Sequence, residues 1–111
     1  MPARDIALRL TDILDGIERI QAFTNGMCFE QFAIDERTEF AVRACFGVIG
    51  EAARHVPEHY TAEHAEIPWQ EMVSMRNFVV HAYWRVSVEV LWDTITNDLP
   101  DLQRAVSALA A

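Results

Sequence analysis

The segment Arg76–Tyr83 reads R-N-F-V-V-H-A-Y and sets four polar side chains in an otherwise apolar stretch. Cleavage of RNA without a metal needs a base for the 2′-hydroxyl, an acid for the leaving 5′-oxygen and positive charge on the phosphate. His81 can move the proton, because histidine titrates near neutral pH. Arg76 can hold and neutralise the phosphate, while Asn77 and Tyr83 orient the nucleotide. These residue types therefore support a phosphate-transfer hypothesis.

A purely structural role explains the same residues equally well. An unpaired Arg among Met75 and Phe78 would be costly to bury, so it needs a partner. In that interpretation Arg76 pairs with an internal carboxylate such as Glu51. His81 and Tyr83 then only tie down the backbone. The residue types alone do not choose between chemistry and structure.

Helical geometry constrains how the motif can act. At about 100° per residue, Arg76 and Tyr83 share nearly one face, and Asn77 and His81 share another. Arg76 and His81 are ~140° apart on an ideal helix, so they do not easily converge on one small ligand. Either the helix loosens near His81, or two copies of the motif meet across a symmetric dimer. Both solutions remain open from sequence.

A second group of histidines has spacing that could bind a metal. His55 and His59 lie four residues apart, as helical zinc ligands do, and His64 follows. Pro57 falls between the first two, however, which makes a continuous helix there doubtful. The neighbouring carboxylates are Glu51, Glu58 and Glu63. We expect a solvated loop rich in His and Glu, with neither a metal nor another cofactor.

Other catalytic classes have little support. There is no G-x-S-x-G motif and no phosphate-cradling glycine loop. Cys28 and Cys45 have no His nearby in sequence and do not form a CxxC pair, so neither a catalytic thiol nor a disulfide scaffold is expected. We set these classes aside.

Composition limits the fold and the partners. The 111 residues, 12.7 kDa, suit one domain over 1–111. Hydrophobic residues make up 51% of the chain and charged residues 23%, which is too apolar for a disordered protein. Fifteen Ala against four Gly and four Pro favour helix.

The charged residues limit the possible partners. All nine positive charges are Arg, against seventeen acidic residues, for a net charge of −8. This net charge excludes binding of nucleic acid through a large basic surface. Since no apolar run approaches a membrane span and no signal-peptide core is present, we expect a cytoplasmic protein.

The N-terminal third is predicted to hold one amphipathic helix. Apolar residues recur at spacings of three and four from 4 to 23. Residues 24–26, Thr-Asn-Gly, form a helix stop. A short connector follows, with Phe29 and Phe32 as candidate core residues.

The next helix is predicted to be central. Asp35 is a good N-cap, and the helix should extend to about His55 with few charges in its middle. Gly47 and Gly50 would let another helix approach closely. We favour tight packing within the monomer, with a dimer contact on that face as the alternative.

The second half contains a conflict between helix and strand. Residues 56–67 suggest a loop or helical turn, and Pro68 suits the first position of a helix. From 78 to 90 every even position is apolar, which is typical of a strand. We reject the strand because nothing else in the chain could pair with it, and Ser87 is a good N-cap for a further helix. The prediction is an all-α, single-domain antiparallel bundle of four to five helices.

The pattern R-x4-H-x-Y at Arg76, His81 and Tyr83 resembles that of the HepT-type toxins, the DUF86 group of the HEPN superfamily. The resemblance extends to I-G-E-A at Ile49–Ala52 and to other short blocks in the same order. Those blocks are Phe29–Phe32, Pro68-Trp69 and Asn97–Pro100. Together they cover about residues 4–103, nearly the whole chain.

The resemblance implies more than the residues do. HepT-type proteins are HEPN-like helical homodimers with the motif in a cleft at the interface, and they act as metal-independent ribonuclease toxins. They form type VII-like toxin–antitoxin pairs with a minimal nucleotidyltransferase, which binds the toxin. In part of the family this antitoxin transfers AMP to the motif tyrosine, here Tyr83, opposing a phosphate substrate beside Arg76. Glu51, in the matching block, could orient Arg76 or His81.

Two hypotheses for the function follow from the motif and the net charge. A protein at −8 repels RNA at long range, so we expect a restricted substrate such as tRNA rather than general nuclease activity. The alternative is a dimeric interaction module without catalysis, which binds the nucleotidyltransferase and presents Tyr83 as an AMP acceptor. Loss of RNA cleavage in His81→Ala with the fold intact would favour the enzyme.

Overall fold

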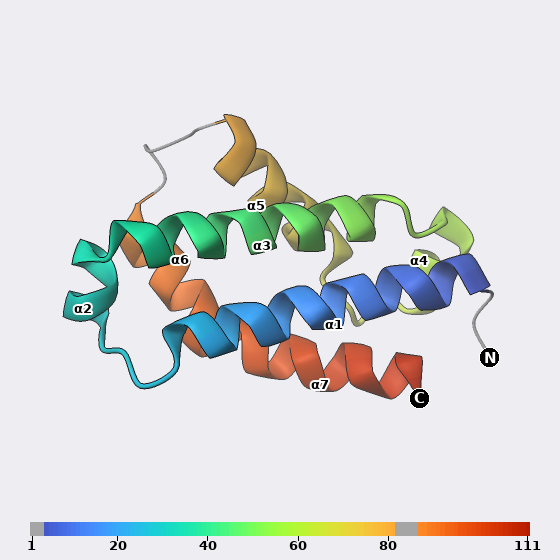
Figure 1. Cartoon of the computed structure of the whole chain (residues 1–111). Coiled ribbons are helices and arrows are strands. Elements are labelled where there is room, and N and C mark those ends of the chain that lie inside the picture. Colours follow the sequence, from blue (N-terminus) through green and yellow to red (C-terminus); the bar gives the residue numbers. More distant parts are fainter. Residues whose placement is uncertain (1–3, 82–86) are drawn as a thin grey trace.

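A computed structural model describes residues 4–81, without the side chain of His81, and residues 87–111 (Figure 1). Every regular element in these two ranges is helical, which confirms the all-α prediction. The elements are α1 Arg4–Thr24, α2 Phe29–Ile34, α3 Glu36–Arg54, α4 Glu58–Glu63, α5 Trp69–His81, α6 Val88–Asp93, the π-helical segment η2 Thr94–Asp98 and α7 Leu99–Ala110. The alternating segment is helical at 78–81 and at 88–90, and the part between 82 and 86 lies outside the described residues.

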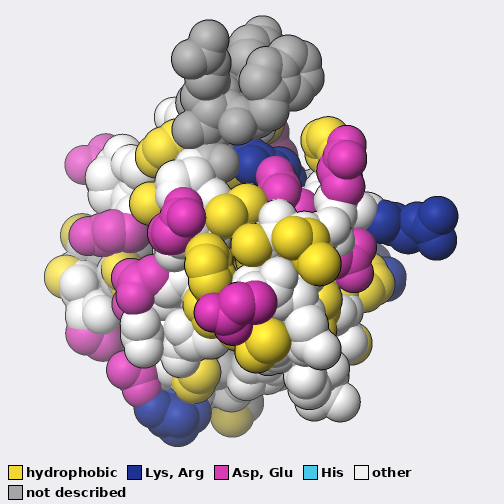
Figure 2. Space-filling view, turned by 90° about the vertical axis from the view of Figure 1, so that its left-hand side faces the viewer, with side chains coloured by type: hydrophobic (Ala, Val, Ile, Leu, Met, Phe, Trp, Pro, Cys, Tyr) yellow, Lys and Arg dark blue, Asp and Glu magenta, His cyan; other side chains and the backbone are white. Residues whose placement is uncertain are grey.

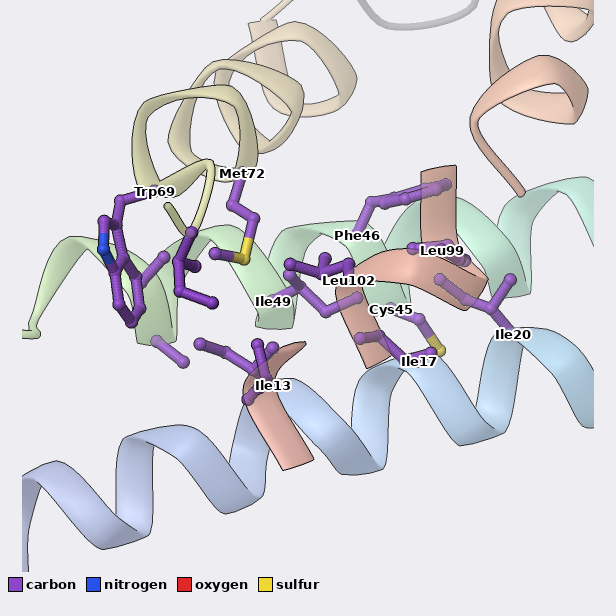
Figure 3. Packing of buried hydrophobic residues seen from close by; sticks show 14 of the residues in the cluster. Ile13, Ile17, Ile20, Cys45, Phe46, Ile49, Trp69, Met72, Leu99 and Leu102 are labelled. Atoms are coloured by element: carbon purple, nitrogen blue, oxygen red, sulfur yellow. The ribbon is translucent and has the colours of Figure 1, made fainter. Parts of the chain in front are cut away.

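Helices α1 and α3 form the centre of the bundle. They lie side by side in opposite directions, with α7 along α1 and α5 against α3 (Figure 1). The apolar stripe predicted for the first helix is buried at Ile6, Leu10, Ile13, Ile17 and Ile20. Figure 3 shows Ile13, Ile17 and Ile20 directed towards side chains from α3 and α7. This burial is the main stabilising contribution for a helical bundle of this size.

Helix α3 begins where its sequence predicts. The side chain of Asp35 accepts a 3.0 Å hydrogen bond from the Thr38 amide and a 2.7 Å bond from the Thr38 hydroxyl. The one cation in its apolar middle, Arg43, is buried and pairs with Glu39 at 2.6 Å. An internal partner one turn away therefore satisfies the charge that the sequence sets inside this helix.

The start of α5 is fixed by an indole. Trp69 is buried, its ring lies 6.3 Å from that of Tyr60, and its Nε1 donates to the His64 carbonyl at 2.9 Å. The structure begins the helix at Trp69, so Pro68 precedes it instead of occupying its first position. Pro68 still accepts the Met72 amide at 3.2 Å. The predicted loop or helical turn over 56–67 contains the short helix α4.

Short helices close the other end of the bundle. The predicted connector after residue 26 contains α2, whose Phe32 is fully buried with its ring 5.2 Å from that of Trp92. Ser87 caps α6 as predicted, accepting from the Glu89 amide at 3.1 Å. On the face shown in Figure 2, acidic side chains surround a central hydrophobic area. None of the described helices is long and apolar enough to cross a membrane.

Candidate functional site

Arg76 lies on α5 with part of its guanidinium accessible. Its side chain is 28% exposed, and Nη1 donates a 3.0 Å hydrogen bond to Oδ1 of Asn77. Nη2 lies 3.9 Å from Oε2 of Glu51, at the outer limit of an ion pair. A guanidinium carries five N–H donors, so these contacts leave donors available for a bound anion.

Glu51 has a nearer partner than Arg76. Its carboxylate accepts 2.8 and 3.3 Å hydrogen bonds from Arg54, and Nδ1 of His55 lies 3.6 Å away. The hydrogen bond from Arg54 is the main cause that holds the pKa of Glu51 below its usual value, and the charges of Arg54, Arg76 and His55 act in the same direction. Glu51 is therefore ionised at neutral pH and adds a fixed negative charge beside Arg76. The Arg76–Glu51 ion pair that the structural interpretation predicts is therefore present, but the two groups are far apart for such a pair.

The position of Arg76 depends on a glycine of α3. A Cβ at Gly50 would lie 2.6 Å from the Met72 carbonyl oxygen and 2.9 Å from Cγ of Arg76. Those distances are below van der Waals contact, so α5 can rest on α3 at this level only because the side chain is missing. Close packing within the monomer, predicted for this pair of glycines, is thus confirmed at Gly50. At Gly47 a Cβ would meet nothing within 4 Å.

Arg76 opens into a groove of about 410 Å³ on one flank of the α3–α5 contact. We call this the Arg76 groove. Its lining residues are Arg9 and Asp12 from α1, Ala44, Gly47, Val48, Glu51 and Ala52 from α3, and Arg76 and Val80 from α5. Of the described side chains, two guanidinium groups and two carboxylates thus line one groove, and the carboxylates weaken its attraction for an extended polyanion.

Sequence analysis did not identify Arg9 as part of this groove. Its spacing showed only that it lies off the apolar stripe of α1. The antiparallel packing of α1 on α3 brings it to the level of Arg76, 67 positions later in the chain. No local signal in the sequence marks such a pairing.

The remaining motif residues are placed only in part. His81 is the last residue of α5, five positions after Arg76 on one helix, and its side chain lies outside the description. Tyr83 lies entirely outside the described residues. The helical backbone through His81 keeps the angular separation from Arg76 expected from sequence. The roles of His81 and Tyr83 stay predictions.

The histidines of the 55–64 segment make local contacts. Nδ1 of His55 lies 2.9 Å from the Glu51 carbonyl, and the ring of His64 lies 4.4 Å from that of Tyr60. Across residues 4–81 and 87–111, no three His, Cys, Asp or Glu side chains are grouped so as to hold a metal ion. Within the described residues, the histidine spacing considered as a possible metal site thus does not assemble a ligand set.

Comparison with known proteins connects this geometry to a family. The family model "Ribonuclease HepT-like" matches residues 13–109. The chain belongs to the HepT-like family. The match spans the second half of α1 through α7, and it confirms the resemblance drawn from the motifs.

Two curated proteins are similar to this one over most of its length. A "Probable ribonuclease HepT" of Thermococcus cleftensis is 46% identical over 94 residues, covering 85% of this chain and 86% of the relative. A "Putative RNase MJ0127" of Methanocaldococcus jannaschii is 36% identical over 101 residues, covering 91% and 84%. No solved structure matches.

Proposed function

We propose that this protein is a metal-independent endoribonuclease, the toxin of a type VII-like toxin–antitoxin pair. The observation that carries the proposal is the accessible guanidinium of Arg76 in a groove, on the same helix as His81. Membership in the HepT-like family and the ribonuclease names of the relatives support it.

The proposed reaction needs only side chains of this chain and the RNA. His81 accepts the proton of the 2′-hydroxyl as the 2′-oxygen attacks phosphorus. The bond between phosphorus and the 5′-oxygen breaks, and that oxygen takes a proton from a second acid. Arg76 neutralises the charge that develops on the phosphate oxygens. The products are a 2′,3′-cyclic phosphate and a 5′-hydroxyl.

A homodimer would supply the second acid. On α3, an apolar stripe runs beside Arg76 with Phe40 and Val48 each 52% exposed, and Val80 of α5 is 40% exposed. Such side chains favour burial against another protein surface. A second copy on this stripe would bring two Arg76 and two His81 residues to one cleft, with one His81 as base and the other as acid.

The balance of positive and negative charge in the Arg76 groove favours a restricted RNA substrate. Asp12 and Glu51 offset the charges of Arg9 and Arg76, and the chain as a whole is at −8. A structured RNA such as tRNA, which presents one phosphate to a small basic site, suits this electrostatics better than an extended polyanion. We further propose that a nucleotidyltransferase antitoxin binds the protein and transfers AMP to Tyr83.

The catalytic proposal is tested with Arg76→Ala and His81→Ala in the presence of a metal chelator. Cleavage of a tRNA pool should fall by about 10²–10⁴-fold in each variant. Arg19→Ala and His59→Ala are matched controls, because both residues are exposed and lie outside the Arg76 groove. Wild-type cleavage by either motif variant would contradict the proposal.

Two further measurements separate the enzyme from the alternative. Intact mass after coexpression with the nucleotidyltransferase should rise by whole AMP units, and the rise should vanish in Tyr83→Phe. A correctly folded protein that binds the nucleotidyltransferase but cleaves no RNA would favour the interaction module. Unfolding of His81→Ala, seen by circular dichroism, would favour a structural role for that side chain.

A further inference from the structure

A second groove, of about 600 Å³, lies on the other flank of the α3–α5 contact. We call it the α5–α7 groove. Helix α5 and the η2–α7 segment form its walls, and α3 forms its floor. Its lining residues are Phe46, Ile49, Glu66, Pro68, Glu71, Met72, Met75, Thr94, Asp98, Leu99, Asp101, Leu102 and Ala105. It shares no lining residue with the Arg76 groove.

The base of the α5–α7 groove is apolar and rigidly packed. Figure 3 shows Phe46, Ile49, Met72, Leu99 and Leu102 directed towards one another from three helices. Each of these side chains is largely buried, so they shape the groove more than they expose surface. Volumes of this size with apolar walls are typical of binding sites in proteins.

The two walls are the faces of two helices. On the α5 wall the lining positions are Pro68, just before the helix, and Glu71, Met72 and Met75 within it, which all fall within two turns. On η2–α7 they extend from Thr94 to Ala105, about 16 Å at 1.5 Å per residue. A channel of this length between two helix faces fits two to three turns of a third helix.

The rim of the α5–α7 groove is acidic. Among the described residues, the charged side chains that line it are Glu66, Glu71, Asp98 and Asp101, all of them acidic. Asp101 pairs with Arg104, and Glu66 lies 3.7 Å from His64. Within the part of the chain that the structure describes, Glu71 and Asp98 have no ion-pair partner. Two carboxylates without an ion-pair partner in residues 4–81 and 87–111 therefore stand on opposite walls above an apolar base.

One wall also departs from α-helical geometry. Residues Thr94–Asp98 form a π-helix, and its first and last residues both line the groove. Such segments are rare, and they are frequent at functional sites. Here the π-helix sets the direction from which Asp98 borders the groove.

We propose that the α5–α7 groove binds an amphipathic helix of a partner protein, with apolar side chains entering the groove and Lys or Arg residues flanking them. Charge complementarity selects this occupant, because Glu71 and Asp98 favour cations at the groove edges. A second copy of this chain is disfavoured, since its net charge of −8 would oppose an acidic rim. The proposal does not depend on ribonuclease activity.

Two synthetic helical peptides of about 14 residues test the proposal. Both carry the same leucine stripe, and the polar face is lysine in one and glutamate in the other. Calorimetry with the full chain should show binding of the lysine peptide, weakened by salt, and no binding of the glutamate peptide. Equal binding of both would overturn the proposal, because charge would then select nothing.

Matched variants locate the binding. Glu71→Gln with Asp98→Asn should weaken binding of the lysine peptide about tenfold, which corresponds to about 1.4 kcal/mol. Asp15→Asn with Glu18→Gln makes the same charge change on the exposed face of α1 and should alter binding less than twofold. Equal effects of the two pairs would overturn the proposal by showing attraction to bulk charge.

Filling the groove gives an independent result. Ala105→Phe, which enters the groove, should abolish peptide binding, whereas Ala108→Phe on the exposed side of α7 should not. Light scattering on the same variants tests for a second copy: a lower oligomeric state in Ala105→Phe alone would assign the groove to self-association and overturn the proposal. If Ala105→Phe fails to fold, the charge variants still show whether the peptide binds in the α5–α7 groove.

Discussion

Replacing Gly50 with alanine adds one methyl group at the contact between α3 and α5. That methyl would lie 2.6 Å from the Met72 carbonyl oxygen and 2.9 Å from Cγ of Arg76, whereas carbon atoms pack best at about 3.5–4.0 Å. The Met72 oxygen belongs to the backbone, so it cannot rotate away. The nearest atom of all would be Cβ of Arg76 itself, so helix α5 must move outward by at least about 1 Å, and Arg76 moves with it.

Gly47→Ala is the matched control for the free energy of unfolding. Both glycines lie in α3, so alanine gains about 0.5–1 kcal/mol of helix stability at each. Only at Gly50 is this opposed by overpacking, which costs about 1–3 kcal/mol. Because the helix term cancels between the variants, Gly50→Ala should be less stable than Gly47→Ala by about 1–3 kcal/mol.

Thermal unfolding followed by circular dichroism measures this difference. For a chain of this size it corresponds to Tm values separated by roughly 5–15 °C. Cleavage by Gly50→Ala should also fall about 10²-fold well below its Tm, because a 1 Å displacement of a phosphate-binding group can cost that much. Equal Tm values for the two variants would refute the claim that Gly50 sets the height of α5.

Two further predictions concern single side chains. Hydrogen bonds from the Thr38 amide and hydroxyl hold the pKa of Asp35 below its usual value. Asp35 thus stabilises the fold above the unfolded-state pKa, about 3.9, and the contribution is lost as pH falls through the lower folded-state pKa. The Tm of wild type should fall more steeply than that of Asp35→Ala below pH ~4, and parallel curves would contradict this. Burial raises the pKa of the Cys45 thiol, whereas Cys28 is exposed. An aromatic disulfide reagent should therefore titrate only Cys28 in the native protein and both thiols in denaturant, and rapid reaction of native Cys28→Ser would count against a buried Cys45.

Local signals explain what sequence analysis predicted well. The stripe of the first helix, the Asp35 cap and the Ser87 cap each depend on residues within one or two turns. The structure therefore has these features where they were expected. The family assignment also followed from local blocks, and the comparison with known proteins confirms it.

The features that sequence analysis missed depend on distant contacts. Helix α2 has six residues, too few to be stable alone, and it forms where Phe32 packs on Trp92, sixty positions later. Arg9 reaches the level of Arg76 only through the packing of α1 on α3. The distances that decide a site are set by tertiary packing, which periodicity does not encode.

The helix that carries Arg76 also differs from the others in how it is held. Of the described elements, α3 is the only one with which α5 shares an extended contact, whereas α1 is held by both α3 and α7. Amide protons exchange through the least costly opening that exposes them. We therefore expect the amides of α5 to exchange through a local opening that leaves α1, α3 and α7 packed, and those of α1 to exchange through global unfolding. The chemistry proposed for this protein is thus carried by an element that one neighbouring helix holds, on a core built from the others.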